Sequence, residues 1–323
     1  PAQLVDNQIS EVLAWMKQAP KPFFAFIHAM DPHGPYTPDP DDFQKLFGQS
    51  IEDALTLLPK EDQTLLDKFR NLYAIQTKGP KAAPPLLNEL TDAAKQYMRQ
   101  LYQAEVFRVD RNFGRMQNYL KREGIEDRTI TVLISDHGEA FFEHGQYKHG
   151  NSLFNEEIHV PLILKLPGGP AGLRVPYSAG LDTLHPTLVT LAGGTPDPCL
   201  PQPSLFTADG KPALQKHLRV FSDRDGYIPD IANWGASVIE GDMKVVWQPK
   251  EKSHAVFDLG ADPREKVNLM NTPQRENAEI RQAVAAFEST LKERTAQGDA
   301  FGEAQWSMSD KSLSEELGGL GYL

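Results

Sequence analysis

The feature that most constrains the fold is a long amphipathic pattern followed almost at once by a short apolar run. Seven apolar residues from Met98 to Leu120 recur every three or four positions, which predicts a helix over residues 97–123. Gly124 stands where the C-cap of such a helix is expected. Residues 130–135, which read Ile-Thr-Val-Leu-Ile-Ser, then predict a buried strand. A helix joined to a buried strand by so few residues is typical of α/β folds.

The remaining segments before residue 200 extend this alternation of helices and strands. Helices are predicted over residues 3–18 and 184–192, and strands over 23–27 and 160–166, with a partly helical insertion at 39–95. We therefore expect an α/β fold in which a mostly parallel sheet is sandwiched by helices. Ligands of such sheets bind beyond the carboxyl ends of the strands, where residues 28–36 and 136–149 are expected to lie.

After residue 200 the pattern changes to short strands joined by turns. Residues 236–239 and 243–247 flank Glu240-Gly241-Asp242, which predicts a β-hairpin. A further strand is predicted at 256–259 and an amphipathic helix at 278–291. We expect two parts, a larger α/β unit over residues 1–200 and a small antiparallel α+β subdomain with a C-terminal helix and tail over residues 201–323.

Composition narrows the classes of partner. The 323 residues contain 33 Lys and Arg against 44 Asp and Glu, a net charge of −11. This acidic balance argues against nucleic acid or anionic lipid as the main partner, and a site for small anions would need locally concentrated positive charge. The single cysteine, Cys199, excludes a disulfide framework and a cysteine-based zinc cluster. No apolar run approaches the roughly 20 residues of a membrane span, and the sequence does not indicate a compartment.

The densest group of chemically active side chains follows the strand predicted at 130–135. Asp136 and His137 come first, and Gly138 permits a tight turn that would offer both side chains to one ion. Divalent cations prefer carboxylate oxygens, and imidazole adds affinity for zinc or manganese. The alternative is a solvated charged loop. The rest of the group consists of Glu139, Glu143, His144, Lys148 and His149.

A second group, His28, Asp31 and His33, follows the strand predicted at 23–27. The segment from Asp31 to Pro38 contains three prolines and a glycine, so it is expected to be an irregular loop that presents His33 rigidly. The alternative is a structural turn in which His33 is hydrogen-bonded locally. Neither group supplies a nucleophile in a Gly-x-Ser-x-Gly elbow, and the sequence contains no phosphate-binding glycine-rich loop and no His-Glu-x-x-His zinc helix.

Several ordered motifs together resemble the sulfatase family of the alkaline phosphatase superfamily. The resemblance covers most of the chain except residues 39–95 and 204–230. The motifs that carry it are Phe26-Ile27-His28-Ala29-Met30-Asp31-Pro32-His33-Gly34-Pro35-Tyr36, residues 101–124, 131–139 and 149–157, Val160-Pro161-Leu162, the stretch from Val256 to Leu269 with Asp262-Pro263, and the ending at 313–323.

The resemblance implies a metal-dependent sulfuric ester hydrolase that acts on a small anionic sulfate ester. In this family two upstream aspartates and a later pair hold a divalent cation, and the later pair matches Asp136 and His137. The cation implied is calcium, with manganese or zinc as alternatives. His33 matches the family's substrate-facing histidine, and His149, or Lys148 as a second candidate, matches the basic residue that contacts the sulfate.

The sequence departs from the family at the nucleophile. The family uses a Cys/Ser-x-Pro-x-Arg motif in its N-terminal half, and neither this motif nor the paired aspartates that accompany it occur here. We therefore expect this sequence to be the C-terminal part of a sulfatase catalytic domain, partnered by an upstream part of the same polypeptide and inactive without it. A phosphoesterase, or a phosphoglycerol- or phosphoethanolamine-type transferase of the same superfamily, is an alternative. A non-catalytic remnant is a third.

Overall fold

A computed structural model describes residues 5–75, 89–150, 152–198, 202–213, 218–224, 235–248 and 252–300. The chain divides into two compact units, of which the first contains residues 1–129 and 306–323 and the second contains residues 130–305. This division falls elsewhere than residue 200, where the sequence pattern changes, and the expected domains 1–200 and 201–323 stay a prediction. Cys199 lies outside the described residues.

The first unit is built around α5, Asp92–Arg122, and its described elements are helices. Thr91 caps the start of α5 by accepting a hydrogen bond from the Ala94 N–H, and Gly124 follows its end at a φ of 63°. The predicted helix therefore exists and starts five residues earlier than expected. The other elements of this unit are α1 (Val5–Gln18), α2 (Pro40–Phe47), α3 (Ile51–Thr56), α4 (Lys60–Ile75) and the 3-10 helix η2 (Glu126–Arg128).

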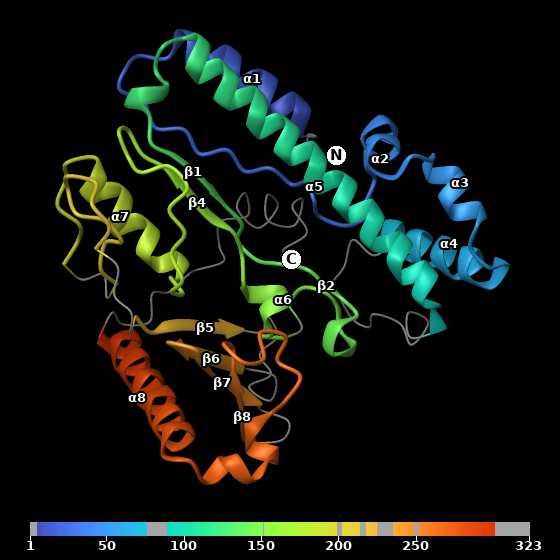
Figure 1. Cartoon of the computed structure of the whole chain (residues 1–323). Helices are drawn as coiled ribbons and strands as arrows, with labels where there is room; N and C mark the ends of the chain where they lie inside the picture. The colour runs from blue at the N-terminus through green and yellow to red at the C-terminus, as the bar shows by residue number, and fades with distance from the viewer. Residues whose placement is uncertain are drawn as a thin grey trace. The chain divides into compact units, whose positions relative to one another are not determined.

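Helix α1 lies alongside α5, as Figure 1 shows in blue and blue-green. Met16 of α1 packs against Tyr119 and Leu120 of α5, and all three side chains are buried. Phe23 packs on the same cluster, but residues 23–27 do not form the strand that their apolar run predicts. In the described part of the chain no strand pairs with this segment, and Phe24 and Phe26 are both 77% exposed.

The second unit contains all the described strands. Strand β1 (Thr131–Ile134) pairs with β4 (Leu162–Lys165), and the short strands β2 (Ala140–Phe141) and β3 (Tyr147–Lys148) form a hairpin. Strands β5 (Val220–Arg224), β6 (Gly235–Glu240), β7 (Met243–Gln248) and β8 (Ser253–Asp258) form a sheet in that order. The helices are α6 (Asn155–Ile158), α7 (Leu184–Leu191) and α8 (Ala278–Ala300), with the 3-10 helices η3 (Glu143–Gly145), η4 (Leu181–Thr183), η6 (Leu269–Asn271) and η7 (Pro273–Glu276).

The strand pairs among the described residues are antiparallel. Strands β1 and β4 pair antiparallel, with Thr131 opposite Lys165, and every other strand pair among the described residues is antiparallel as well. The predicted mixture of helices and sheets and the C-terminal antiparallel sheet are confirmed. The mostly parallel sheet stays a prediction, since β1 and β4 pair antiparallel and the segment 23–27, another predicted strand, has no partner strand among the described residues.

The sheet β5–β8 buries both of its faces. Helix α8 lies across one face (Figure 1), where Ile280 and Phe287 pack against Val245 and Val256. On the other face Val246 and Phe257 contact Leu153, with Phe154 and Ile158 of the α6 region beside them. Neighbouring residues such as Val245 and Val246 thus serve opposite cores, as the two-residue period of a strand requires.

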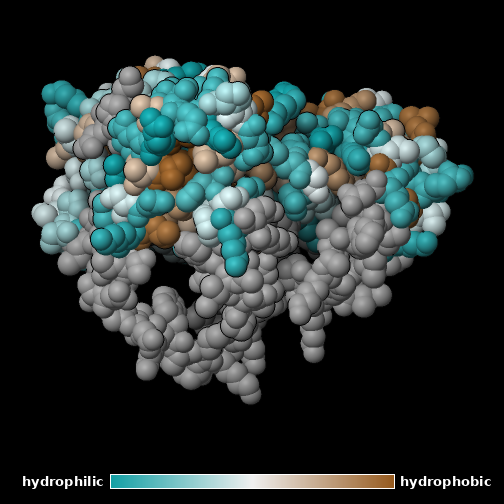
Figure 2. Space-filling view, turned by 90° about the horizontal axis from the view of Figure 1, so that it is seen from below, coloured by the Kyte–Doolittle hydropathy of each residue, from teal (hydrophilic) through white to brown (hydrophobic). Residues whose placement is uncertain are grey.

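On the face drawn in Figure 2, hydrophobic residues form small patches separated by hydrophilic ones. Among the described residues, no helix combines the length and the apolar character needed to cross a membrane.

The core beneath α8 gives a stability test. Phe287 is 1% exposed, so Phe287→Ala should lower the free energy of unfolding by about 3–5 kcal/mol, because a large cavity forms in a packed core. Urea denaturation measures the loss. Lys292→Ala, an exposed position of the same helix, is the control and should change it by less than about 0.5 kcal/mol. Equal effects of the two variants would show that α8 does not pack on the sheet.

Candidate active site

The Asp136–His137 turn follows β1 after Ser135 and holds a carboxylate and an imidazole close together. The His137 Nε2 atom lies 3.7 Å from the Asp136 Oδ2 atom, and the Asp136 side chain is 57% exposed. The His137 Nδ1 atom lies 2.8 Å from the Gly138 carbonyl oxygen, which can only accept, so Nδ1 carries the proton. In the neutral ring Nε2 then keeps a lone pair on the side of the carboxylate. This tautomer is the one that a metal-binding histidine adopts when a carbonyl orients it.

The turn is held by a close approach of two backbone segments. The Gly138 N–H donates to the Glu157 carbonyl oxygen at 2.7 Å. A Cβ atom at residue 138 would lie only 2.2 Å from the Glu156 carbonyl oxygen, so no side chain fits there. The sequence indicated a tight turn at Gly138, and the structure shows that contact with α6 is what requires glycine.

His149 lies against His137. The two rings stack with their centroids 3.9 Å apart, and the His149 Nδ1 atom lies 3.0 Å from the Glu139 Oε1 atom. The Glu139 side chain is 5% exposed, so a buried carboxylate fixes the orientation of the His149 ring. Sequence reasoning included Glu139 in the charged group but did not assign it this task. The only sequence signal for this role of Glu139 was its position shortly after the strand predicted at 130–135. The contact between Glu139 and His149 forms only because the β2–β3 hairpin brings the two residues together.

Lys148 belongs to the same hairpin, opposite Ala140. Burial lowers the pKa of Lys148 to about 8, although the Glu139 carboxylate acts in the opposite direction. Its backbone has a φ of 70°, and Phe142 and His144 in the same hairpin also have positive φ angles. Non-glycine residues in this region are strained, and such strain is found preferentially at functional sites.

His33 lies in the first unit and is described there by itself. Its Nδ1 atom lies 2.7 Å from the Gly34 carbonyl oxygen, so a local hydrogen bond holds the ring. The His33 backbone N–H donates to the Met30 carbonyl oxygen. Asp31 is tied to α5 by an ion pair with Arg108, at 3.1 Å. The structure therefore brings together Asp136, His137 and His149, with Lys148 on the same hairpin as His149, and it shows for His33 the local hydrogen bond that the structural-turn alternative expects.

The donor set for a metal ion is partial. Among the described residues, no group of three or more His, Cys, Asp or Glu side chains converges closely enough to hold an ion. Asp136 and His137 offer one carboxylate and one imidazole nitrogen, which fits a divalent cation that has further ligands elsewhere.

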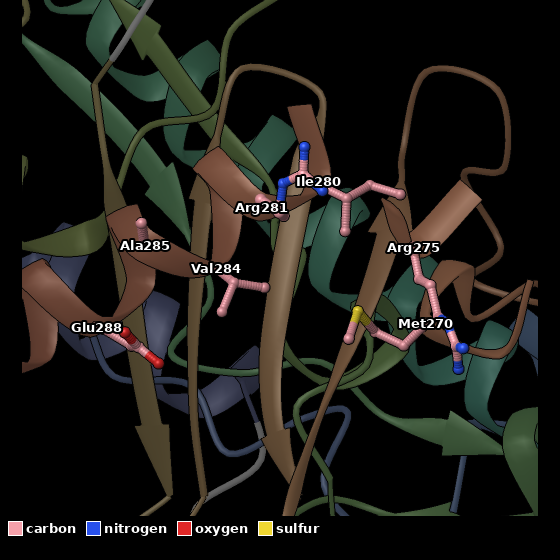
Figure 3. A pocket seen from close by; sticks show the side chains of 7 residues that line it. All are labelled: Met270, Arg275, Ile280, Arg281, Val284, Ala285 and Glu288. Atoms are coloured by element: carbon pink, nitrogen blue, oxygen red, sulfur yellow. The ribbon is translucent and has the colours of Figure 1, made fainter. Parts of the chain in front are cut away.

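A pocket away from the Asp136–His137 turn is shown in Figure 3. It measures about 210 Å³ and lies between η6, η7 and α8. Its arginines, Arg275 and Arg281, both lie within ion-pair distance of the same Glu276 carboxylate, which offsets part of their charge. Its walls include the apolar Met270, Ile280 and Val284, and it contains none of the residues singled out from the sequence.

Comparison with known proteins gives a consistent result. The family model described as Sulfatase matches residues 3–194. Mouse arylsulfatase K is 28% identical over 278 residues, which cover 80% of this chain and 49% of that protein. Human iduronate 2-sulfatase is 29% identical over 269 residues, which cover 71% of this chain and 47% of that protein. The chain therefore spans about half the length of the curated relatives it matches.

Solved structures show the same fold. A protein solved in complex with its substrate D-glucosamine-2-N,6-O-disulfate matches with a TM-score of 0.66 at 21% identity, covering 90% of this chain and 70% of that one. The phosphonate monoester hydrolase of Agrobacterium radiobacter matches with a TM-score of 0.66 at 22% identity, with 92% and 62% covered.

The close approach at residue 138 gives a matched test. Gly138→Ala should lower the free energy of unfolding by about 1–3 kcal/mol, because the new methyl group forces the turn and α6 apart. Gly114→Ala is the control, since nothing lies within 4 Å of its Cβ position in α5. That change should instead raise the free energy by up to about 1 kcal/mol through better helix propensity. Thermal and urea denaturation of both variants measure whether the free energy of unfolding falls in Gly138→Ala and rises in Gly114→Ala.

Proposed function

The chain belongs to the sulfatase family, and from this membership we propose that the whole protein hydrolyses sulfate esters with the help of a divalent cation. The observation that carries the proposal is the Asp136–His137 turn, in which a carboxylate and an oriented imidazole face each other within the matched region 3–194. Because the chain spans about half of its curated relatives, we propose that the nucleophile and the remaining metal ligands come from outside this sequence. Strands that would complete a mostly parallel sheet come from there as well.

Asp136 and His137 would hold the cation, which we propose to be calcium, with manganese or zinc as alternatives. When bound, the cation would neutralise charge that develops on the ester oxygens. Asp136 contributes a negative charge to the cation site, which the neutral imidazole of His137 does not supply. His137 keeps its Nδ1 proton on the Gly138 carbonyl oxygen and directs Nε2 toward the carboxylate.

Lys148 provides the local positive charge that an acidic chain needs to receive an anion, and His149 lies next to it on the same hairpin. Lys148 attracts the sulfate group while its ammonium is protonated. The Nδ1 proton of His149 is engaged by Glu139, so Nε2, on the opposite edge of the ring, is the atom that would give a proton to the leaving oxygen. His33 is proposed to contact the substrate from its own rigid loop.

A phosphoester or phosphonate hydrolase is the second candidate. It is favoured by the fold likeness to the Agrobacterium phosphonate monoester hydrolase. Charge stabilisation on a tetrahedral anion serves either ester, so the site residues have the same tasks in both readings.

Removing one proposed ligand tests the function. In the whole protein, Asp136→Asn should abolish hydrolysis of an aryl sulfate and reduce bound metal, because the variant keeps the shape and removes the charge. Metal analysis and a parallel assay with an aryl sulfate, an aryl phosphate and a phosphonate monoester measure both effects. Asp182→Asn, at another position of the same unit, is the control. Full metal content in Asp136→Asn, or turnover of the phosphorus esters alone, would contradict the proposal.

The low pKa of Lys148 gives a pH dependence. Lysine is cationic below its pKa, so kcat/KM should fall as pH rises through about 8, because the anionic ester then loses an attractive charge. Lys148→Arg keeps the positive charge at all accessible pH values. Its profile should therefore lack this alkaline decline, and a decline at the same pH in both proteins would remove Lys148 from substrate binding.

A further inference from the structure

The sheet β5–β8 is connected to the Asp136–His137 turn by a continuous set of polar contacts through α6. We propose that Lys244, Glu265 and Asn155 are positioning residues for this turn, so that the C-terminal sheet sets the geometry of the metal-binding pair. The proposal rests on the proposed function for its catalytic meaning, while the mechanical link can be tested by itself. It also assigns a task to the stretch from Val256 to Leu269, which the resemblance singled out without giving it a role.

The link begins with an ion pair that is buried in the second unit. The Lys244 Nζ atom lies 2.6 Å from the Glu265 Oε1 atom, and both side chains are fully buried. Lys244 stands two residues before Val246 on β7, so it faces the α6 side of the sheet. Burial lowers the pKa of Lys244, opposed by the Glu265 carboxylate. A buried pair costs desolvation energy and is weak support for stability alone, so its directional contacts are what need an explanation.

Those contacts hold Asn155, the first residue of α6, at two points. The Asn155 N–H donates to the Glu265 Oε2 atom at 2.6 Å. The Lys244 ammonium donates to the Asn155 Oδ1 atom at 3.0 Å. One member of the ion pair thus holds the backbone of α6 and the other holds a side chain, which fixes both the position and the rotation of this short helix.

His144 adds a second attachment between the same segments. Its Nδ1 atom lies 2.8 Å from the Glu156 Oε1 atom, and its Nε2 atom lies 3.1 Å from the Glu265 carbonyl oxygen. Its ring stacks on Phe154 with centroids 3.7 Å apart. A carboxylate and a carbonyl both accept, so this arrangement is satisfied by the doubly protonated ring. Although burial opposes it, the hydrogen bond to Glu156 raises the pKa of His144.

The link ends at the metal-binding turn through backbone alone. The Glu157 carbonyl oxygen accepts from the Gly138 N–H, and the Glu156 carbonyl oxygen fills the space where a Cβ of residue 138 would stand. The Gly138 carbonyl oxygen in turn fixes the His137 ring. No flexible side chain lies between α6 and Gly138, so a displacement of α6 is passed directly to the ligand pair.

A purely structural role predicts a different outcome from a positioning role. If Lys244, Glu265 and Asn155 only stabilise the fold, variants that remain folded should keep the metal affinity and the turnover of the wild type. If they position the turn, folded variants should bind metal more weakly and show a lower kcat, while KM for the ester changes little because Lys148 and His149 still meet the anion.

Two variants of the whole protein test the link. Asn155→Ala removes the side-chain acceptor and keeps the backbone bond to Glu265, and the double variant Lys244→Met with Glu265→Gln removes both buried charges together. Calorimetry measures manganese binding, and an assay with an aryl sulfate gives kcat and KM. Hydrogen exchange measures the protection of the Gly138 amide. Arg219→Met is the matched control, because Arg219 pairs with Glu240 at 2.8 Å on the half-exposed part of the same sheet.

We expect Asn155→Ala and the double variant to weaken manganese binding about 10-fold or more and to lower kcat similarly. The Gly138 amide should exchange faster in both, and the Arg219→Met protein should match the wild type. Unchanged Gly138 exchange and unchanged manganese affinity in folded Asn155→Ala would overturn the link, even if the double variant fails to fold. A wild type without sulfatase turnover, but with faster Gly138 exchange in Asn155→Ala, would overturn the proposed function and support the link.

Discussion

The geometry of the site depends on the absence of one side chain. Because residue 138 is glycine, the backbone after β1 touches the backbone of α6, with the Gly138 N–H on the Glu157 carbonyl oxygen. That contact sets where Asp136 and His137 stand. It also means that whatever holds α6 holds Asp136 and His137, and α6 has only four residues. So short a helix has little intrinsic stability, and its place must come from tertiary contacts.

Much of the fold could be predicted because its signals are local. The spacing of apolar residues from Met98 to Leu120 defined most of α5, and Glu240-Gly241-Asp242 located the β6–β7 hairpin, where Gly241 adopts a φ of 62°. The run at 23–27 is as strand-like in its apolar character as β1, yet it pairs with no strand in the described part of the chain. Strand formation requires a partner, and neither the partner nor the antiparallel direction of β1 and β4 is written in the run itself.

The site was predictable to the extent that its members are neighbours in the sequence. Asp136 and His137 are adjacent, so their shared orientation followed from one tight turn. The carboxylate that orients His149 is ten residues away across a hairpin, and Lys244 and Glu265 come from separate segments that meet only in the folded unit. In the sequence these charges look like ordinary solvated residues. Their burial is a property of the sheet and α6 together, which no local pattern encodes.

In each unit a buried cation forms an ion pair that ties down a short segment of the chain. In the first unit Arg108, 5% exposed, pairs with Asp31 two residues before His33. In the second, Lys244 and Glu265 hold Asn155, next to the residues that contact Gly138. Apolar packing resists compression but tolerates rotation and sliding, whereas hydrogen bonds between charged groups specify direction. The proposed metal site offers two ligand atoms to one ion and needs such directional control, which the buried charges supply despite their desolvation cost.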